Sequence, residues 1–211
     1  MAEQHEIGTP ETVSPEPRKA SVRRSTRETT IQLELTLDGS GRCDVQTGIG
    51  FLDHLLDALA RHARLDLTLR AEGALVVDDH HTAEDCGIVL GQALYQALGD
   101  RRGIHRFGHA YAPLDEALVR TVVDLSGRPH AEVNIDFHRD AIGELACENI
   151  GHVLESIAIN ARLTLHVDLI RGRNDHHKAE AAFKATALAL RAAVSRDIAL
   201  GDAIPSTKGA L

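Results

Sequence analysis

The stretch HLLDALARHARLDL at residues 54–67 returns later in the chain as HVLESIAINARLTL at residues 152–165. Seven of the fourteen positions are identical, and four more are close substitutions. A second segment repeats in the same order, because DHHTAE at residues 79–84 returns as DHHKAE at residues 175–180. Two ordered matches with offsets of 98 and 96 residues indicate an internal duplication. The two halves are therefore expected to fold alike.

The sequence around these segments predicts a similar order of elements in both halves. Alternating apolar residues predict strands, and apolar residues at helical spacing predict helices. The expected strands span residues 31–37, 65–69, 118–125, 133–137 and 163–167. The expected helices span residues 51–63, 79–98, 143–161 and 175–195. We therefore expect an α+β fold built from a duplicated strand-strand-helix-strand-helix half, with helices on one face of mixed sheets.

The domain boundaries follow from the repeat and from composition. The first repeat half is expected at residues 21–101 and the second at residues 102–200. Residues 1–20 are polar and hold three of the six prolines, so we expect a disordered N-terminal tail. We expect deletion of the residues before about Lys19 to leave activity intact. Residues 201–211 form a separate C-terminal tail.

Composition narrows the function classes. The formal net charge of -8 argues against a nucleic-acid partner, and no apolar run is long enough to span a membrane. The three cysteines are far apart and make neither a disulfide framework nor a metal clip, so we expect free thiols in a cytoplasmic protein. The 13 histidines are the unusual feature, because histidine suits metal binding and proton transfer.

The repeated DHHxxE elements have the spacing of metal ligands. Each element opens an expected helix, with Asp79 or Asp175 as the predicted N-cap residue. Neighbouring helix residues point about 100° apart, so His80 and His81 are expected to face two different ions. Glu84 lies within one turn of both histidines and shares their face.

Two such elements facing each other would hold two ions, and the repeated residues His54 and His152 would add a third imidazole to each site. A lone histidine pair is more often a solvated helix start, but the duplication favours metal binding. Nitrogen and carboxylate ligands fit manganese, iron or zinc, and an open coordination position is typical of a catalytic site. The predicted metal ligands are His54, His80, His81, Glu84, His152, His176, His177 and Glu180.

Three other functions share these ligand types. A two-metal hydrolase would consume water, and a metal-storage protein would need no substrate site. A di-iron carboxylate protein is less consistent, because such proteins favour helical bundles with several bridging carboxylates.

At these residues the sequence resembles the imidazoleglycerol-phosphate dehydratase family of histidine biosynthesis, from about Arg24 to Leu211. The motifs that carry the resemblance are GIGFLDHLLDALARHA, DDHHTAEDCGIVLG, RFGHAYAPLDEAL, DLSGRP, NDHHKAEAAFKA and PSTKG. The resemblance implies a cytoplasmic hydro-lyase that converts imidazole glycerol phosphate to imidazole acetol phosphate and water. It also implies two Mn²⁺ per active site, bound by the same eight ligands, and an octahedral 24-mer with sites completed between subunits.

Further roles follow from the resemblance and from the chemistry of the reaction. The substrate hydrogen to be removed is not acidic, so we expect a metal-bound imidazolate to expel the hydroxyl group. The expected acid and base groups are Glu180, Glu84 and Glu28, with Glu28 placed on the first strand. The resemblance implies that the C-terminal tail binds phosphate. The expected substrate-binding residues are Glu28, His54, His62, Arg106, Arg128, Lys184, Ser206 and Lys208.

Overall fold

The structure is a computed structural model that describes residues 17–73 and 75–211. The elements of the first half are β1 (Lys19–Ser25), β2 (Thr29–Thr36), β3 (Cys43–Gln46), α1 (Gly50–Ala63), β4 (Asp66–Gly73) and α2 (His80–Leu98). The elements of the second half are β5 (Phe107–Leu114), β6 (Ala117–Asp124), β7 (His130–Asn134), α3 (Cys147–Asn160), β10 (Thr164–Arg171) and α4 (Asp175–Val194). A short hairpin, β8 (Ala141–Ile142) with β9 (Leu145–Ala146), precedes α3.

The two halves have the same sheet topology, which confirms the expected duplication within an α+β fold. The N-terminal sheet has the strand order β1-β2-β4-β3, and the C-terminal sheet has the order β5-β6-β10-β7. In each sheet the last pair is parallel and the other pairs are antiparallel. Both sheets are therefore mixed, as the sequence predicts.

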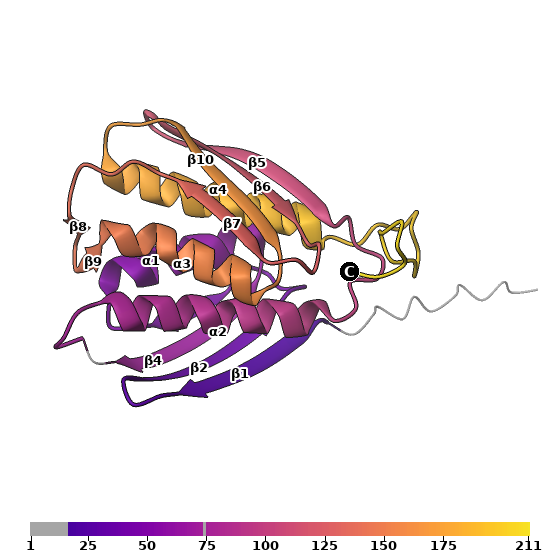
Figure 1. Ribbon diagram of the computed structural model, residues 1–211, viewed down its shortest axis with the longest axis horizontal. Coiled ribbons are helices and arrows are strands. Elements are labelled where there is room, and N and C mark those ends of the chain that lie inside the picture. The colour runs from indigo at the N-terminus through magenta and orange to yellow at the C-terminus, as the bar shows by residue number, and fades with distance from the viewer. Residues whose placement is uncertain (1–16, 74) are drawn as a thin grey trace, which may run out of the picture.

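The helices cover one face of each sheet and form the middle of the molecule. Helices α1 and α2 contact the N-terminal sheet, whereas α3 and α4 contact the C-terminal sheet. The two helix layers then pack on each other, α2 against α3 and α1 against α4 (Figure 1). This packing across the middle brings residues of the two halves together.

The core is built by the alternation that the sequence shows. Ile31, Leu33 and Leu35 are fully buried on one face of β2, and Leu67 and Leu69 are buried beside them on β4. Burying an aliphatic side chain of this size contributes about 1.5–3 kcal/mol each. The polar residues between them remain on the outer face of the sheet.

The structure corrects the predicted elements at the sheet edges. Two strands were expected before the first long helix of each half, but the first half has three and the second half has three plus the short β8–β9 hairpin. The missed strands of the two main sheets are β1, β3 and β5. All three are edge strands. An edge strand needs few buried residues, and in β1 only Val22 is buried, so the alternating apolar signal is weak.

Smaller corrections concern element ends. Residues 143–146 were expected to begin a helix, but they belong to the β8–β9 hairpin, in which Gly143 has a φ of 60°. Strand β7 ends at Asn134, earlier than the predicted end at residue 137. The predicted N-terminal tail lies mostly outside the described residues, and Lys19 and Ala20 belong to β1. No helix in the described part of the chain combines the length and apolarity needed to cross a bilayer.

Candidate metal centre

His54, His176 and Glu180 form the first cluster of potential ligands, which we call the α1/α4 cluster. The His54 Nε2 atom lies 2.9 Å from Glu180 Oε2, and His176 Nε2 lies 3.2 Å from the same oxygen. The potential ligand atoms all lie within 4.8 Å of one another. His54 belongs to the first half of the chain, and the other two residues belong to the second half.

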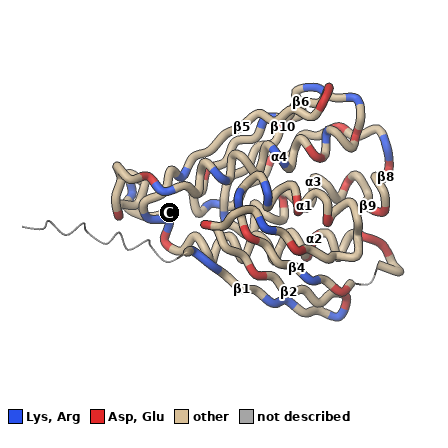
Figure 2. Tube along the Cα trace, turned by 180° about the vertical axis from the view of Figure 1, so that it is seen from behind, with Lys and Arg blue, Asp and Glu red and all other residues tan. Residues whose placement is uncertain are grey.

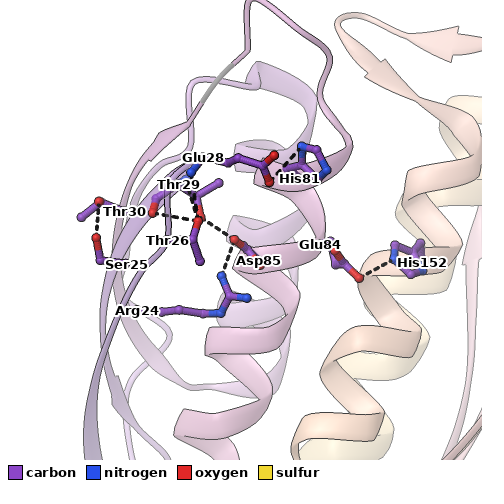
Figure 3. A network of polar contacts seen from close by, with 10 residues as sticks. All are labelled: Arg24, Ser25, Thr26, Glu28, Thr29, Thr30, His81, Glu84, Asp85 and His152. Atoms are coloured by element: carbon purple, nitrogen blue, oxygen red, sulfur yellow. Dashed lines mark hydrogen bonds and ion pairs between the residues drawn. The ribbon is translucent and has the colours of Figure 1, made fainter.

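His80, Glu84 and His152 form the second cluster, which we call the α2/α3 cluster. The His152 Nε2 atom lies 3.2 Å from Glu84 Oε1. Figure 3 shows these two side chains pointing toward one another. The His80 and His152 rings are stacked with their centroids 5.1 Å apart. Asn149 holds the first of these rings, because its Oδ1 atom lies 2.8 Å from His80 Nδ1. This cluster also combines residues from both halves.

The structure places the second histidine of each DHHxxE element outside these clusters. His81 Nδ1 lies 3.5 Å from Glu28 Oε2, and His177 Nδ1 lies 2.7 Å from Glu116 Oε2. The divergence within each histidine pair follows the predicted angle between neighbouring helix residues. The repeat predicted that the two DHHxxE elements face each other in one site. Within this chain they do not. Each meets the repeated histidine of the other half, because α2 packs on α3 and α4 packs on α1.

The aspartates before the histidines act differently from the prediction. Asp79 occupies the N-cap position of α2, but its side chain makes no capping hydrogen bond and instead accepts one from the Ala146 backbone N–H at 2.7 Å. Asp175 lies inside α4, and Asn174 is the N-cap residue, accepting from the His176 backbone N–H. Asp175 is buried and pairs with the buried Lys178 at 2.8 Å.

A cationic side chain adjoins the α1/α4 cluster. The Lys184 Nζ atom lies 2.6 Å from Glu180 Oε1. Burial alone would raise the pKa of Glu180, but the hydrogen bonds from Lys184 and His54 outweigh it and hold the pKa at about 2. Burial and the ammonium group of Lys184 lower the pKa of His62 below its ordinary value. The site therefore combines the strongly acidic Glu180 with the Lys184 side chain and with His62, whose pKa is lowered.

Most of the residues expected to bind phosphate gather elsewhere. Arg106 donates two hydrogen bonds to Asp124, at 2.7 and 3.2 Å, and a third to the Pro205 carbonyl at 2.8 Å. Arg128 Nη2 lies 3.8 Å from the same aspartate. The Ser206 hydroxyl oxygen accepts a hydrogen bond from the backbone N–H of Lys208 at 3.2 Å. The C-terminal tail is thereby held near two arginines.

These phosphate candidates and the histidine clusters lie at opposite ends of the folded molecule. The helices α2 and α4 begin at one end of the molecule, whereas the C-terminal tail lies at the other (Figure 1). A 19-residue helix such as α2 spans about 28 Å. Figure 2 shows acidic and basic residues mixed along the trace, including the C-terminal end. Lys184 is the exception, since it lies beside the α1/α4 cluster.

Two glutamates lie in equivalent hairpin turns of the two halves. Glu28 was expected on the first strand, but it lies in the turn between β1 and β2, near His81 (Figure 3). Its side chain is 56% exposed. Glu116 was not identified from the sequence, although it occupies the corresponding turn between β5 and β6. The available signal was its place in the PLDEAL motif, directly between two strands of the second half.

The ligand types in both clusters fit a divalent transition metal. Each cluster offers two imidazoles and one carboxylate and contains no thiolate, a combination that suits manganese, iron or zinc. Each carboxylate also comes within hydrogen-bonding distance of an imidazole, so the groups already converge on one point.

Comparisons with known proteins agree on one family. The profile of the imidazoleglycerol-phosphate dehydratase family matches residues 47–190. The imidazoleglycerol-phosphate dehydratase of Granulibacter bethesdensis is 58% identical over 194 residues, which cover 92% of this chain and 99% of that protein. The crystal structure of the Staphylococcus aureus enzyme is similar with a TM-score of 0.77 and 38% identity, covering 84% of this chain and 99% of that one. The Pyrococcus furiosus structure has a TM-score of 0.78 and 36% identity, covering 90% of this chain and all of that one.

Proposed function

This chain belongs to the imidazoleglycerol-phosphate dehydratase family of histidine biosynthesis, whose members are hydro-lyases, and on that premise we propose a metal-dependent mechanism for it. The proposed reaction converts imidazole glycerol phosphate to imidazole acetol phosphate and water. The proposed centre uses the two histidine–glutamate clusters and the two histidines outside them. The observation that carries the proposal is the pair of matched three-residue clusters at the starts of duplicated helices.

We propose that each cluster is completed by a histidine from a neighbouring subunit. One chain supplies two histidines and one glutamate to each cluster, which leaves His81 and His177 turned away. A neighbouring copy could supply either residue as the third imidazole. Most of the phosphate candidates lie at the end of the molecule that is away from the histidine clusters. This placement supports the same arrangement, because the tail of another subunit could then bind the substrate phosphate. A closed homo-oligomer, such as the octahedral 24-mer that the family resemblance implies, would supply both the third histidine and the phosphate-binding tail.

The residues of the two clusters would hold two Mn²⁺ ions, which when bound would supply Lewis acidity at the substrate ring. The residues of the chain would hold the substrate and move protons. The low pKa of Glu180 makes it a good ligand and a weak base. Glu28 has an exposed carboxylate next to His81, which suits a group that transfers a proton.

The reaction requires removal of a hydrogen that no carbonyl group activates. Water leaves when the carbon–oxygen bond next to the ring breaks and the neighbouring carbon loses its proton, and the enol product tautomerises to the ketone. Lys184 and the tail residues Ser206 and Lys208 would bind the phosphate through charge and hydrogen-bond donors.

The three cysteines are all free thiols in the structure, which supports the proposed cytoplasmic location.

The test is turnover of imidazole glycerol phosphate by metal-stripped protein before and after Mn²⁺ is added. We expect ketone formation to be lost on stripping and restored by Mn²⁺, with no release of inorganic phosphate. Turnover that is indifferent to stripping would contradict the metal mechanism. Phosphate release without ketone formation would instead indicate a two-metal hydrolase.

A further inference from the structure

Glu116 makes an unusual set of contacts at the start of α4. Its Oε1 atom accepts hydrogen bonds from the backbone N–H groups of Arg173 at 3.0 Å and Asn174 at 2.7 Å. Its Oε2 atom lies 2.7 Å from Nδ1 of His177. One carboxylate therefore fixes both the loop that enters the helix and the ring of a histidine on the first turn.

The contact with His177 determines which ring nitrogen carries hydrogen. An ionised carboxylate can only accept hydrogen bonds, so His177 must donate from Nδ1. In the neutral ring the lone pair then lies on Nε2, which faces the exposed Asp115 carboxylate at 3.8 Å, beyond hydrogen-bonding distance, and can bind an ion. Carboxylates that accept from the far nitrogen of a metal-binding histidine set its tautomer and orientation.

We propose that Glu116 is a positioning residue that presets His177 to bind a divalent ion through Nε2. The inference rests on the proposed function, in which His177 completes a cluster of a neighbouring subunit. Glu116 would bind neither ion nor substrate, and its effect would pass entirely through the imidazole ring. It adds a residue that the ligand motifs do not contain.

The corresponding pair in the first half shows that this arrangement is specific. Glu28 occupies the equivalent hairpin turn, but its Oε2 atom lies 3.5 Å from His81 Nδ1 and its side chain is 56% exposed, against 27% for Glu116. Its carboxylate accepts no hydrogen bond from the backbone before α2 among the described residues, unlike that of Glu116. The second-half carboxylate is held in place, whereas its counterpart is free to meet substrate.

The proposal predicts a distinct effect for Glu116→Gln. The amide oxygen would continue to accept from the two backbone N–H groups, which places the amide NH₂ group against His177 Nδ1. That NH₂ group donates, so the ring would have to accept at Nδ1 and carry its hydrogen on Nε2. We expect one of the two classes of Mn²⁺ site to weaken by about 10- to 100-fold, as for other outer-sphere partners of metal-binding histidines.

Calorimetric titration of Mn²⁺ into the metal-stripped assembly would measure this effect, with thermal denaturation of the same metal-stripped samples as a check on folding. We expect wild-type protein to bind two ions per subunit, the Glu116→Gln variant to keep its metal-free melting temperature, and excess Mn²⁺ to restore its turnover. Glu34→Gln is the charge-matched control, because Glu34 is exposed in the middle of β2. This control variant should bind Mn²⁺ as the wild type does.

The possible outcomes separate the two proposals. Unchanged affinity of both sites in Glu116→Gln, with normal binding by the wild type, would overturn the positioning role alone. Equal weakening of both sites together with a lower metal-free melting temperature would also overturn it, since the residue would then act only on folding. A wild-type protein that binds no Mn²⁺ would overturn the proposed function and this inference with it.

Discussion

The α1/α4 and α2/α3 clusters share one ligand pattern but have different surroundings. Each has two histidines and a glutamate from equivalent positions of the repeat. One turn beyond the glutamate, however, the first has Lys184 where the second has Ile88. His62 likewise corresponds to Asn160. The duplication has therefore kept the ligands and changed the positions around them, which is what an unsymmetrical substrate would require of two otherwise equal sites.

A difference in burial distinguishes the helix starts. Asp175 and Lys178 are 2% and 1% exposed and form an ion pair, whereas the equivalents of this pair in the first half are Asp79 and Thr82. The N-terminus of α4 thus has a buried ion pair, whereas at the start of α2 the Asp79 carboxylate accepts a hydrogen bond from the Ala146 backbone N–H. The predictions below test how far the two clusters differ, from the largest expected effect to the smallest.

The largest effect is expected from Asp175→Asn. The change leaves the buried ammonium group of Lys178 without a counter-ion, which costs about 3–5 kcal/mol of unfolding free energy. Asp79→Asn is the matched variant and should cost only about 1 kcal/mol, because it weakens one hydrogen bond. Urea unfolding of the metal-free proteins measures both values. Equal losses would show that the two helix starts are energetically alike.

Removal of the equivalent ligand from either cluster should have the same effect on turnover. We expect His54→Ala and His152→Ala each to lower kcat at least about 100-fold, because both ions are required for the proposed chemistry. Each variant should also bind one Mn²⁺ fewer per subunit in calorimetry. If one variant keeps full turnover, only the other cluster takes part in catalysis.

Lys184→Ile makes the α1/α4 cluster resemble its counterpart. Loss of a charge-assisted hydrogen bond to Glu180 or to substrate should lower kcat/KM by about tenfold or more. Steady-state kinetics at saturating Mn²⁺ would measure it. The matched change Ile88→Leu preserves the apolar character at the equivalent position and should leave kcat/KM within about twofold. Unchanged kinetics of Lys184→Ile would show that the lysine does not distinguish the clusters.

The smallest effect is expected in the dependence of stability on pH. Glu180 has a folded-state pKa of about 2, below its ordinary value of 4.5, so its contribution to stability is present above pH 4.5 and is lost as the pH falls towards 2. In Lys184→Ile the main hydrogen bond that lowers this pKa is missing. The metal-free variant should therefore lose less stability than the wild type between pH 4.5 and pH 2. Parallel acid-unfolding curves would contradict this explanation of the pKa.

The sequence predicts the buried parts of the fold better than its edges. The central strands β2, β4, β6 and β10 and all four long helices lie where alternation or helical spacing predicts them. The missed strands β1, β3 and β5 are edge strands, with one neighbouring strand each. A strand with only one neighbouring strand needs fewer buried residues, so β1, β3 and β5 show little regular apolar alternation, whereas the edge strand β7 was predicted because Val133 and Ile135 do alternate.

The sequence by itself determined the ligand types, their duplication and the divergence of each histidine pair. These properties are local, because the angle between neighbouring helix residues depends only on backbone geometry. Only the tertiary structure decided that His54 meets His176 and that His80 meets His152. It also decided that Glu116 reaches His177 and that the C-terminal tail lies at the end of the molecule opposite the histidine clusters. These relations depend on which helices pack across the middle of the molecule, and burial of apolar surface, which has no direction of its own, sets that packing.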